Sequence, residues 1–342
     1  MIESVEFKNF KALRDAKLPL GRFTLIVGPN GSGKSTVFQA LKSLQPQLLS
    51  FHQIVSAELR GSADAIVEVV VSWGPPYDGM VIFEWNLAGR IGPTISVDYA
   101  RRLIRDPHAS VVDGGYFTTV LQRIAVYSLD AEKLAQQAMV REGVELGERG
   151  EDLPAVLDRL SDQEPERFEA LNAELGRCLP EYDRILFEAT NSPGTKAILL
   201  RTRDGGHRIP AADVSQGTLL TLALLTIAYQ PHPPSVVCLE EPDRGIHPRL
   251  LAEIRDAMYR LSHPESFGED REPVQVIATT HSPYLLDLYR DHPEEVVIAE
   301  KLEGGVRFER LSDYPHVDEI LQDARLGDVW YTGILGGVPS HT

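Results

Sequence analysis

One segment constrains this chain more than any other, because it matches the pattern G-x-x-x-x-G-K-[ST] in full. Its residues are Gly28, Pro29, Asn30, Gly31, Ser32, Gly33, Lys34, Ser35 and Thr36. An apolar run, Phe23 to Val27, precedes the segment, and apolar residues at helical spacing follow it. A glycine-rich loop between a strand and a helix presents convergent backbone N–H groups to phosphate oxygens. We therefore expect a nucleoside triphosphate here, with Lys34 reaching its β- and γ-phosphates and Ser35 ligating Mg²⁺.

A second apolar run, Val236 to Leu239, ends in two adjacent carboxylates, Glu240 and Glu241. Ligands of open α/β sheets bind beyond the carboxyl ends of the strands, which is where these two side chains are expected. We predict that Glu240 joins the Mg²⁺ shell and that Glu241 polarises the attacking water. The alternative is a pair of solvated acids at the end of a buried strand. The phosphate loop upstream favours the catalytic interpretation.

Two further motifs follow the same logic. His281, in the stretch ATTHSP, follows the apolar run Val274 to Ala278 after two threonines, and its imidazole could contact a γ-phosphate or the attacking water. Ser215 and Gly217, in the stretch VSQGT, precede a long apolar helix; Ser215 is a good N-cap, and Gly217 allows a phosphate to approach the helix start. In isolation, a structural histidine and a plain helix cap are the alternatives.

Composition limits the partners and the compartment. The net charge of −16 excludes nucleic-acid binding by bulk charge, so DNA could be held only by a local patch such as Arg101-Arg102-Leu103-Ile104-Arg105, with Arg90. We prefer a solvated face for that cluster. The two cysteines, Cys178 and Cys238, exclude a disulfide framework and a cysteine-rich zinc site. With no apolar stretch of roughly 20 residues and no signal pattern, we expect a cytoplasmic protein without a membrane partner.

The periodicities predict an α/β fold within one domain, residues 1–342. Short strands are expected near the N-terminus, an antiparallel sheet over 57–85, a strand pair over 184–203 and a hairpin near residue 304. An acidic helical insert over 129–182 carries one apolar stripe: Leu153, Val156, Leu157 and Leu160. We divide the domain into an N-terminal core with an antiparallel part (1–95), a helical insert (96–205), a second core part (206–311) and a C-terminal segment (312–342). We expect the tail residues to be core: Trp330, Tyr331, Ile334 and Leu335.

In this order and spacing, the four motifs resemble an ATPase of the ABC class, in the branch that contains RecF, the chromosome-maintenance (SMC) heads and the OLD-family ATPases. The chain is most similar to stand-alone bacterial AAA-type ATPases that carry E-E-P-x-x-x-x-H-P, here Glu240 to Pro248, and T-H-S-P, here Thr280 to Pro283. The resemblance runs from Val5 to Trp330, nearly the whole chain. It implies an ABC-type P-loop ATPase head, with a mixed or parallel core sheet, an antiparallel β subdomain and a helical insert.

The resemblance also implies roles for the motifs. Gly28 to Thr36 corresponds to the Walker A loop, Glu240 and Glu241 to the Walker B acids, and His281 to the switch histidine. The signature motif corresponds to Val214 to Thr218, with Ser215, Gln216 and Gly217 at its centre. In that family two heads enclose two ATP molecules with Mg²⁺. Each signature helix caps the γ-phosphate that the partner's Walker A loop holds, so we expect a homodimer that ATP closes and hydrolysis opens.

Several departures from the wider class matter. The signature is Ser-Gln-Gly and not the Ser-Gly-Gly-Gln of transporters, which argues against a transporter subunit. His247 replaces the aspartate that transporters carry after Walker B, as is usual in the resembled branch. Glu240 stands where many relatives have aspartate, and its extra methylene still permits contact with Mg²⁺ through a water. The glutamine-loop residue is open among Gln122, Gln136 and Gln137; Gln122 precedes the apolar run Ile124 to Tyr127 and is favoured.

The function expected from the resemblance is ATP binding and hydrolysis that depend on Lys34, Ser35, Glu241 and His281 and that drive a DNA or protein effector. The setting would be DNA repair, recombination or anti-phage defence. About 30 residues follow the predicted hairpin, too few for a nuclease domain, so we expect the effector to be a separate chain.

The alternative is a slowly hydrolysing, ATP-bound scaffold that holds a separate nuclease or toxin. A nucleotide kinase or GTPase is a weaker option, because the chain contains no N-K-x-D stretch.

Overall fold

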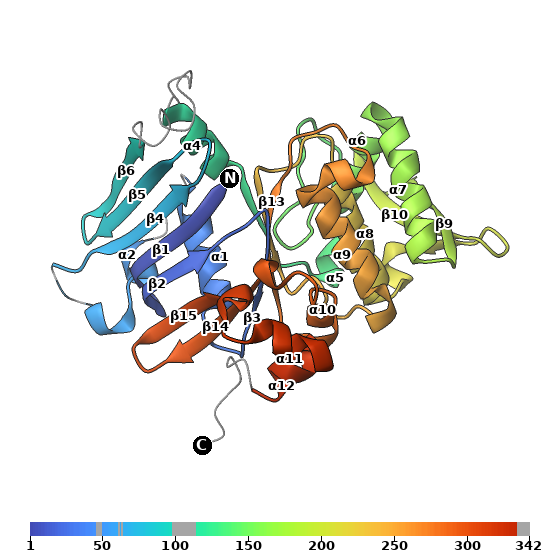
Figure 1. The fold of residues 1–342 in the computed structure, drawn as a ribbon. Coiled ribbons are helices and arrows are strands. Elements are labelled where there is room, and N and C mark those ends of the chain that lie inside the picture. The colour runs from blue at the N-terminus through green and yellow to red at the C-terminus, as the bar shows by residue number, and fades with distance from the viewer. Residues whose placement is uncertain (46–49, 61, 63, 98–113, 334–342) are drawn as a thin grey trace. The chain divides into compact units, whose positions relative to one another are not determined.

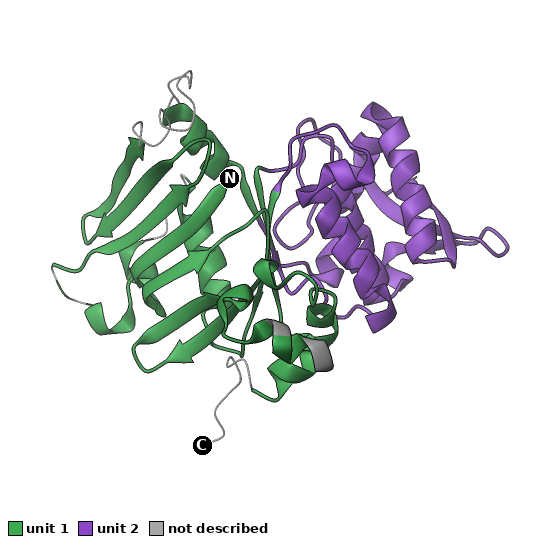
Figure 2. Ribbon diagram, in the orientation of Figure 1, with its two compact units in different colours: residues 1–125, 235–238, 275–342 green, residues 126–234, 239–274 purple. Residues whose placement is uncertain are grey.

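The computed structural model describes residues 1–45, 50–60, 62, 64–97 and 114–333. The chain divides into two compact units (Figure 2). Unit 1 comprises Met1–Ala125, Ser235–Cys238 and Gln275–Thr342, and unit 2 comprises Val126–Pro234 and Leu239–Val274. The basic cluster at residues 101–105 and the tail residues Ile334 and Leu335 lie outside the described residues.

Unit 1 contains a five-stranded antiparallel sheet in the order β2-β1-β4-β5-β6 (Figure 1). Its strands are β1 (Ile2–Phe10), β2 (Leu13–Pro19), β4 (Val67–Trp73), β5 (Gly79–Asn86) and β6 (Gly89–Val97). In β4, every second side chain from Val67 to Trp73 is buried and the residues between them are partly exposed. This alternation is what a sheet with one covered face requires, and it confirms the antiparallel sheet that the sequence predicts.

The second sheet has six strands in the order β15-β14-β3-β13-β12-β7. They are β3 (Phe23–Val27), β7 (Ile124–Tyr127), β12 (Val236–Glu240), β13 (Gln275–Thr280), β14 (Val296–Leu302) and β15 (Gly305–Arg310). Strand β3 pairs in parallel with β13 and with β14, and β14 and β15 form the predicted antiparallel hairpin. All residues of β3 and β13 are buried, which explains why both strands consist of apolar residues and threonine, apart from Gln275 at the start of β13.

Helix α1 (Lys34–Ser43) follows β3 and buries Val37, Phe38 and Leu41. The other helices in the described part of unit 1 are α2 (Phe51–Ile54), η1 (Ala57–Leu59), α4 (Gly114–Gln122), α10 (Pro283–Asp287), η5 (Pro293–Glu295), η6 (Leu311–Asp313), α11 (Val317–Asp323) and α12 (Leu326–Tyr331). In the tail, Trp330 is buried as predicted, but Tyr331 is 76% exposed, so its assignment to the core was wrong. Helix α12 ends there, and only one of its faces packs on the unit.

Unit 2 is mainly helical. Its helices are α5 (Ala131–Leu134), α6 (Leu153–Gln163), α7 (Pro165–Cys178), η2 (Ala211–Asp213), α8 (Gln216–Tyr229), η3 (Pro248–Leu250), α9 (Leu251–Ser262) and η4 (Pro264–Phe267). A small antiparallel sheet joins β8 (Ala138–Met139), β9 (Tyr182–Ala189), β10 (Thr195–Thr202) and β11 (Arg208–Pro210). The predicted stripe on α6 is buried. Helix α8 is buried from Thr218 to Tyr229, which explains why it is apolar on every side.

This mixed α/β architecture, with parallel strands in the core sheet, an antiparallel sheet and a helical part, confirms the fold class expected from the sequence.

Candidate functional site

The phosphate loop lies in unit 1, between the last residue of β3, Val27, and the first residue of α1, Lys34. Two of its glycines hold left-handed backbone, with φ of +78° at Gly31 and +86° at Gly33. Gly28 is required for space, because a Cβ there would stand 2.3 Å from the carbonyl oxygen of Ala299 in β14. The loop conformation therefore depends on glycine at both positions that the motif specifies, Gly28 and Gly33, and also at Gly31.

The Lys34 ammonium folds back over this loop. Its Nζ donates to the carbonyl oxygens of Gly28, at 2.7 Å, and Pro29, at 2.9 Å, and to the Ser32 hydroxyl at 3.3 Å. Lys34 is buried, whereas Ser35 beside it is exposed at the N-terminus of α1. The loop thus places one cation among backbone groups, next to the exposed Ser35 side chain.

Strand pairing brings His281 to the same edge of the sheet as this loop. Thr280, the last residue of β13, pairs in parallel register with Val27, the last residue of β3. His281 and Gly28 are the next residues of their strands, so both chains leave the sheet at the edge where parallel strands present ligands. Ser282 then caps α10 by accepting a hydrogen bond from the Leu285 amide at 3.3 Å.

In unit 2, Glu240 and Glu241 line a cavity of about 570 Å³. Gln216 of the signature segment lines the same cavity. The other lining residues are Tyr127, Ser128, Leu129, Asp130, Ala131, Glu132, Leu220, Leu239, Pro242 and Arg244. One cavity is therefore lined by Glu240, Glu241 and Gln216, which come from positions far apart in the chain.

Glu241 holds a left-handed backbone conformation, with φ of +45°. Such a conformation costs a residue with a side chain roughly 1–2 kcal/mol and persists only where the surroundings enforce it. The turn after it is closed by hydrogen bonds from the Arg244 amide to the Glu241 carbonyl, at 2.9 Å, and from the Ile246 amide to the Asp243 carbonyl, at 3.1 Å. The backbone thus turns sharply at the acid that the sequence predicts as the general base.

The signature segment packs against this turn. A Cβ on Gly217 would stand 3.0 Å from the Gly245 carbonyl oxygen, so only glycine allows this approach without a shift. Ser215 caps α8 as predicted, since its Oγ accepts from the Thr218 amide at 3.1 Å. Ser215 and Gln216 are both exposed. The start of α8 therefore combines exposed polar side chains with the N-terminus of a long helix.

The structure singles out a segment that the sequence reasoning missed. Tyr127 to Glu132 line the cavity of unit 2. The three candidates for the glutamine-loop residue, Gln122, Gln136 and Gln137, do not line it. Gln122 is the exposed last residue of α4, and Gln136 and Gln137 are exposed. Burial raises the pKa of Tyr127 to about 12. The apolar run 124–127 could have indicated this segment, because residues that follow a core strand lie at the edge of the sheet where ligands bind.

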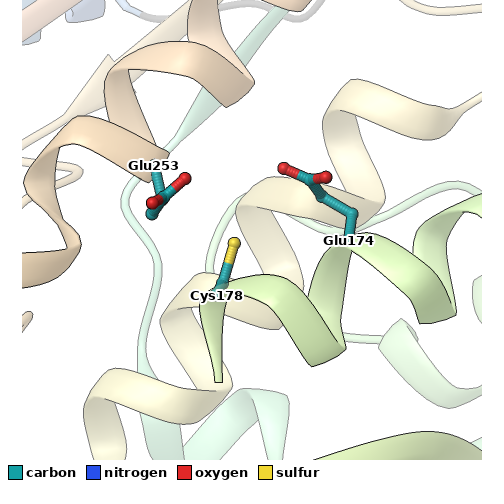
Figure 3. A group of neighbouring side chains, drawn as sticks. All are labelled: Glu174, Cys178 and Glu253. Atoms are coloured by element: carbon teal, nitrogen blue, oxygen red, sulfur yellow. The ribbon is translucent and has the colours of Figure 1, made fainter. Parts of the chain in front are cut away.

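Glu174, Cys178 and Glu253 face one another between α7 and α9 (Figure 3), and one ligand atom of each lies within 4.8 Å of the others. Arg177 pairs with both carboxylates. Burial, reinforced by these carboxylates, raises the pKa of the Cys178 thiol to about 12, which keeps it protonated and a poor metal ligand. We therefore assign the cluster to the packing of α7 on α9.

Arg90, the described member of the basic patch, is committed to the fold. Its guanidinium donates to the carbonyl oxygens of Leu44 and Gln45, both at 3.0 Å, at the C-terminal end of α1. It also stacks over the Phe83 ring, 4.6 Å from the centroid. The described part of the proposed DNA patch is thus a helix cap, which explains a basic residue in this position without a nucleic acid.

Comparison with known proteins shows the family to which this chain belongs. The family described as "AAA domain, putative AbiEii toxin, Type IV TA system" matches residues 111–287, more than half of the chain. The chain belongs to this family. A second AAA ATPase domain family matches residues 1–70. The resemblance to ABC-class ATPases of the RecF, SMC and OLD branch, which the motifs indicated, is thereby confirmed for this AAA-family ATPase.

Two similar proteins extend the comparison. An OLD nuclease of Thermus scotoductus is 24% identical over 367 residues, covering 96% of this chain and 68% of the nuclease. A structure of an SMC head bound to the C-terminal winged-helix domain of ScpA aligns with a TM-score of 0.58 at 18% identity, covering 90% of this chain and 96% of that one. The AAA-family ATPase thus shares the fold of an SMC head. Among its described residues, no helix is long and apolar enough to cross a membrane.

Proposed function

We propose that this AAA-family protein hydrolyses ATP, and that ATP closes two copies into a dimer whose state is transmitted to DNA or to a separate effector protein. The observation that carries the proposal is the loop Gly28–Thr36, in which the Lys34 ammonium is held by the loop's own carbonyl oxygens at 2.7 and 2.9 Å. The loop geometry is that of a polyanion site, with backbone N–H groups, a helix N-terminus and one cation.

The roles of the remaining groups follow from their chemistry. Lys34 neutralises charge on the β- and γ-phosphates, and Glu241 accepts a proton from the attacking water. His281 donates a hydrogen bond to the γ-phosphate or to that water. The Ser35 hydroxyl and the Glu240 carboxylate are oxygen ligands of the kind that Mg²⁺ prefers, and the metal would supply charge neutralisation between the phosphates when bound. Phosphoryl transfer needs positioning and electrostatic stabilisation more than covalent chemistry, which these groups supply.

The dimer is proposed from the exposed start of α8. Ser215 and Gln216 are exposed side chains at the N-terminus of a 14-residue helix, whose dipole attracts an anion. A phosphate that is already bound to a second copy of the chain is such an anion. We infer that the effector acts on nucleic acid, because a relative over nearly the whole chain is named a nuclease.

The test combines phosphate release with light scattering on the same samples, with and without ATP and Mg²⁺. The proteins are the wild type, Lys34→Ala, Glu241→Gln and His281→Ala, with Glu188→Gln, an exposed glutamate of β9, as the matched control. We expect Glu241→Gln to lose roughly 10²- to 10⁴-fold in turnover and to accumulate as an ATP-dependent dimer. Lys34→Ala should lose ATP binding as well, and Glu188→Gln should match the wild type.

The outcomes separate the alternatives. If the wild type binds ATP and dimerises but releases almost no phosphate, the protein is an ATP-bound scaffold that holds an effector. If Glu241→Gln turns over ATP like the wild type, the assignment of the general base is wrong. If neither the wild type nor Glu241→Gln changes its mass with ATP, the shared-site dimer fails.

A further inference from the structure

Helix α10, which begins two residues after His281, is too short to hold its own position. It contains five residues, Pro283–Asp287, and a helix of that length is unstable in water without packing. Leu285 and Leu286 are fully buried, so the helix is fixed by what covers it. The direction in which the chain leaves β13, and therefore the placement of His281, depends on those contacts.

The covering element is the C-terminal helix α12, from the segment LGDVW that the phosphate chemistry does not use. Gly327 lies directly on Pro283: a Cβ at position 327 would stand 2.4 Å from the Pro283 carbonyl oxygen and 2.8 Å from the Pro283 Cβ. The Gly327 amide also donates to the Asp287 carboxylate at 2.7 Å. One glycine therefore touches both ends of α10.

A second tie follows α10. The Arg290 guanidinium donates to the carbonyl oxygen of Leu321 in α11. On its other side α10 is continuous with the sheet, because the Ser282 amide donates to the Thr280 hydroxyl at 2.9 Å. The chain from Thr280 to Arg290 is thus fixed by the sheet at one end and by the C-terminal helices at the other, with His281 in the first part.

We propose that α12 is a positioning element for the switch histidine, and that Gly327 and Asp287 act on ATP hydrolysis through His281. The proposal rests on the proposed ATPase function for its rate readout. Neither residue touches the nucleotide. A displacement of Pro283 by the width of a methyl group moves the segment that carries His281, and a misplacement of about 1 Å in a catalytic group can cost as much as 10²-fold in rate.

The experiment compares Gly327→Ala with Gly304→Ala in the full chain. Gly304 is the matched control, because nothing lies within 4 Å of a Cβ built there. We expect Gly327→Ala to lower kcat roughly tenfold or more, with little change in KM for ATP, while Gly304→Ala leaves both unchanged. Asp287→Ala should act in the same direction, and Asp287→Asn, which keeps an acceptor oxygen, should restore most of the rate. These Asp287 variants keep the proposal testable if Gly327→Ala does not fold.

A double-mutant comparison separates positioning from general damage. If Gly327 acts through His281, then adding Gly327→Ala to His281→Ala changes kcat by less than about twofold, because the coupled residue is already gone. If the two losses multiply, or if Gly327→Ala retains the wild-type kcat, the proposal is overturned.

A spectroscopic readout separates this proposal from the proposed function. The imidazole signals of His281, identified by their loss in His281→Ala, are recorded by NMR for the wild type, Gly327→Ala and Gly304→Ala. They should shift in Gly327→Ala alone. If the wild type releases no phosphate but the His281 signals shift in Gly327→Ala, the ATPase function is refuted and the positioning role is supported. An active wild type whose His281 signals and rate are unmoved by Gly327→Ala refutes the positioning role alone.

Discussion

Gly28 and Ala299 are in backbone contact across the phosphate loop, so that a Cβ on Gly28 would stand 2.3 Å from the Ala299 carbonyl oxygen. Ala299 belongs to β14, which pairs in parallel with β3, and its position is fixed by that pairing. The same Cβ would stand 2.9 Å from the Ser32 hydroxyl. The first glycine of the motif is therefore held on both sides, and any larger residue must move the strand or the loop.

Gly28→Ala is therefore expected to damage ATP binding and stability together. The clash with strand backbone should cost about 1–3 kcal/mol of the free energy of unfolding, the range found for overpacked sites. ATP affinity should fall as well, because the loop that presents its N–H groups is displaced. Thermal unfolding and calorimetric titration with a slowly hydrolysed ATP analogue measure both effects. Gly92→Ala, where a Cβ meets nothing within 4 Å, is the control, and a Gly28→Ala protein indistinguishable from it would show that the loop adapts.

Gln275 should be a sensitive position of unit 1, because its buried side-chain amide makes three hydrogen bonds. Its Oε1 accepts from the Ile2 amide at 3.0 Å, and its Nε2 donates to the carbonyl oxygens of Ile2 and Gly21 at 2.7 and 2.8 Å. Gln275→Ala leaves these backbone groups without that partner, and each buried unsatisfied group costs about 1–3 kcal/mol. We expect a loss of several kcal/mol in denaturant unfolding, whereas Gln230→Ala should cost less. Equal losses for the two variants would contradict this ranking.

Particular residues show which features of the structure can be predicted from the sequence. The phosphate loop with its flanking strand and helix is one contiguous segment, and the apolar strand with its two terminal acids is another. Local sequence pattern was therefore sufficient to predict each of them. Gln275 was not noted, because its partners Ile2 and Gly21 are more than 250 residues away and no local pattern marks them. The contact of Gly327 with Pro283 was missed for the same reason, since it depends on the packing of two short helices.

The cavity segment Tyr127–Glu132 shows a different limit. Residue type alone favours Gln122, Gln136 and Gln137 for the glutamine loop, whereas the residues that line the cavity are those at and after the end of β7. Tyr331 was expected in the core because of its type, but an amphipathic terminal helix has an exposed face. Residue type alone therefore predicts the chemistry of a position better than it predicts which surface the position occupies.

The Cys178 thiol gives a pH prediction. Burial and the nearby carboxylates raise its pKa in the folded protein to about 12, from an ordinary value of 9.0. Since the folded state binds the proton more tightly than the unfolded state, this group's stabilising contribution is complete below about pH 9 and is lost as the pH rises toward 12. The stability difference between the wild type and Cys178→Ala should therefore shrink between pH 8 and pH 10.5 in denaturant unfolding. A difference that is constant or grows over this range would contradict the prediction.

Arg90 provides the last prediction, because it decides between a DNA contact and a structural cap. Its two hydrogen bonds to Leu44 and Gln45 and its position over Phe83 stabilise the C-terminal end of α1, the helix that follows the phosphate loop. Arg90→Ala should cost about 1–3 kcal/mol of the free energy of unfolding, through lost charge-assisted hydrogen bonds and lost packing. Arg90→Lys should recover only part of this, since an ammonium cannot reproduce the forked donors or the planar stack.

Arg208→Ala, at an exposed arginine of β11, is the matched control and should leave stability within about 0.5 kcal/mol of the wild type. Denaturant unfolding gives these values, and fluorescence anisotropy with a labelled DNA duplex at two salt concentrations tests the other interpretation. If Arg90→Ala is as stable as the wild type but weakens salt-dependent DNA binding, Arg90 is a phosphate contact and not a cap.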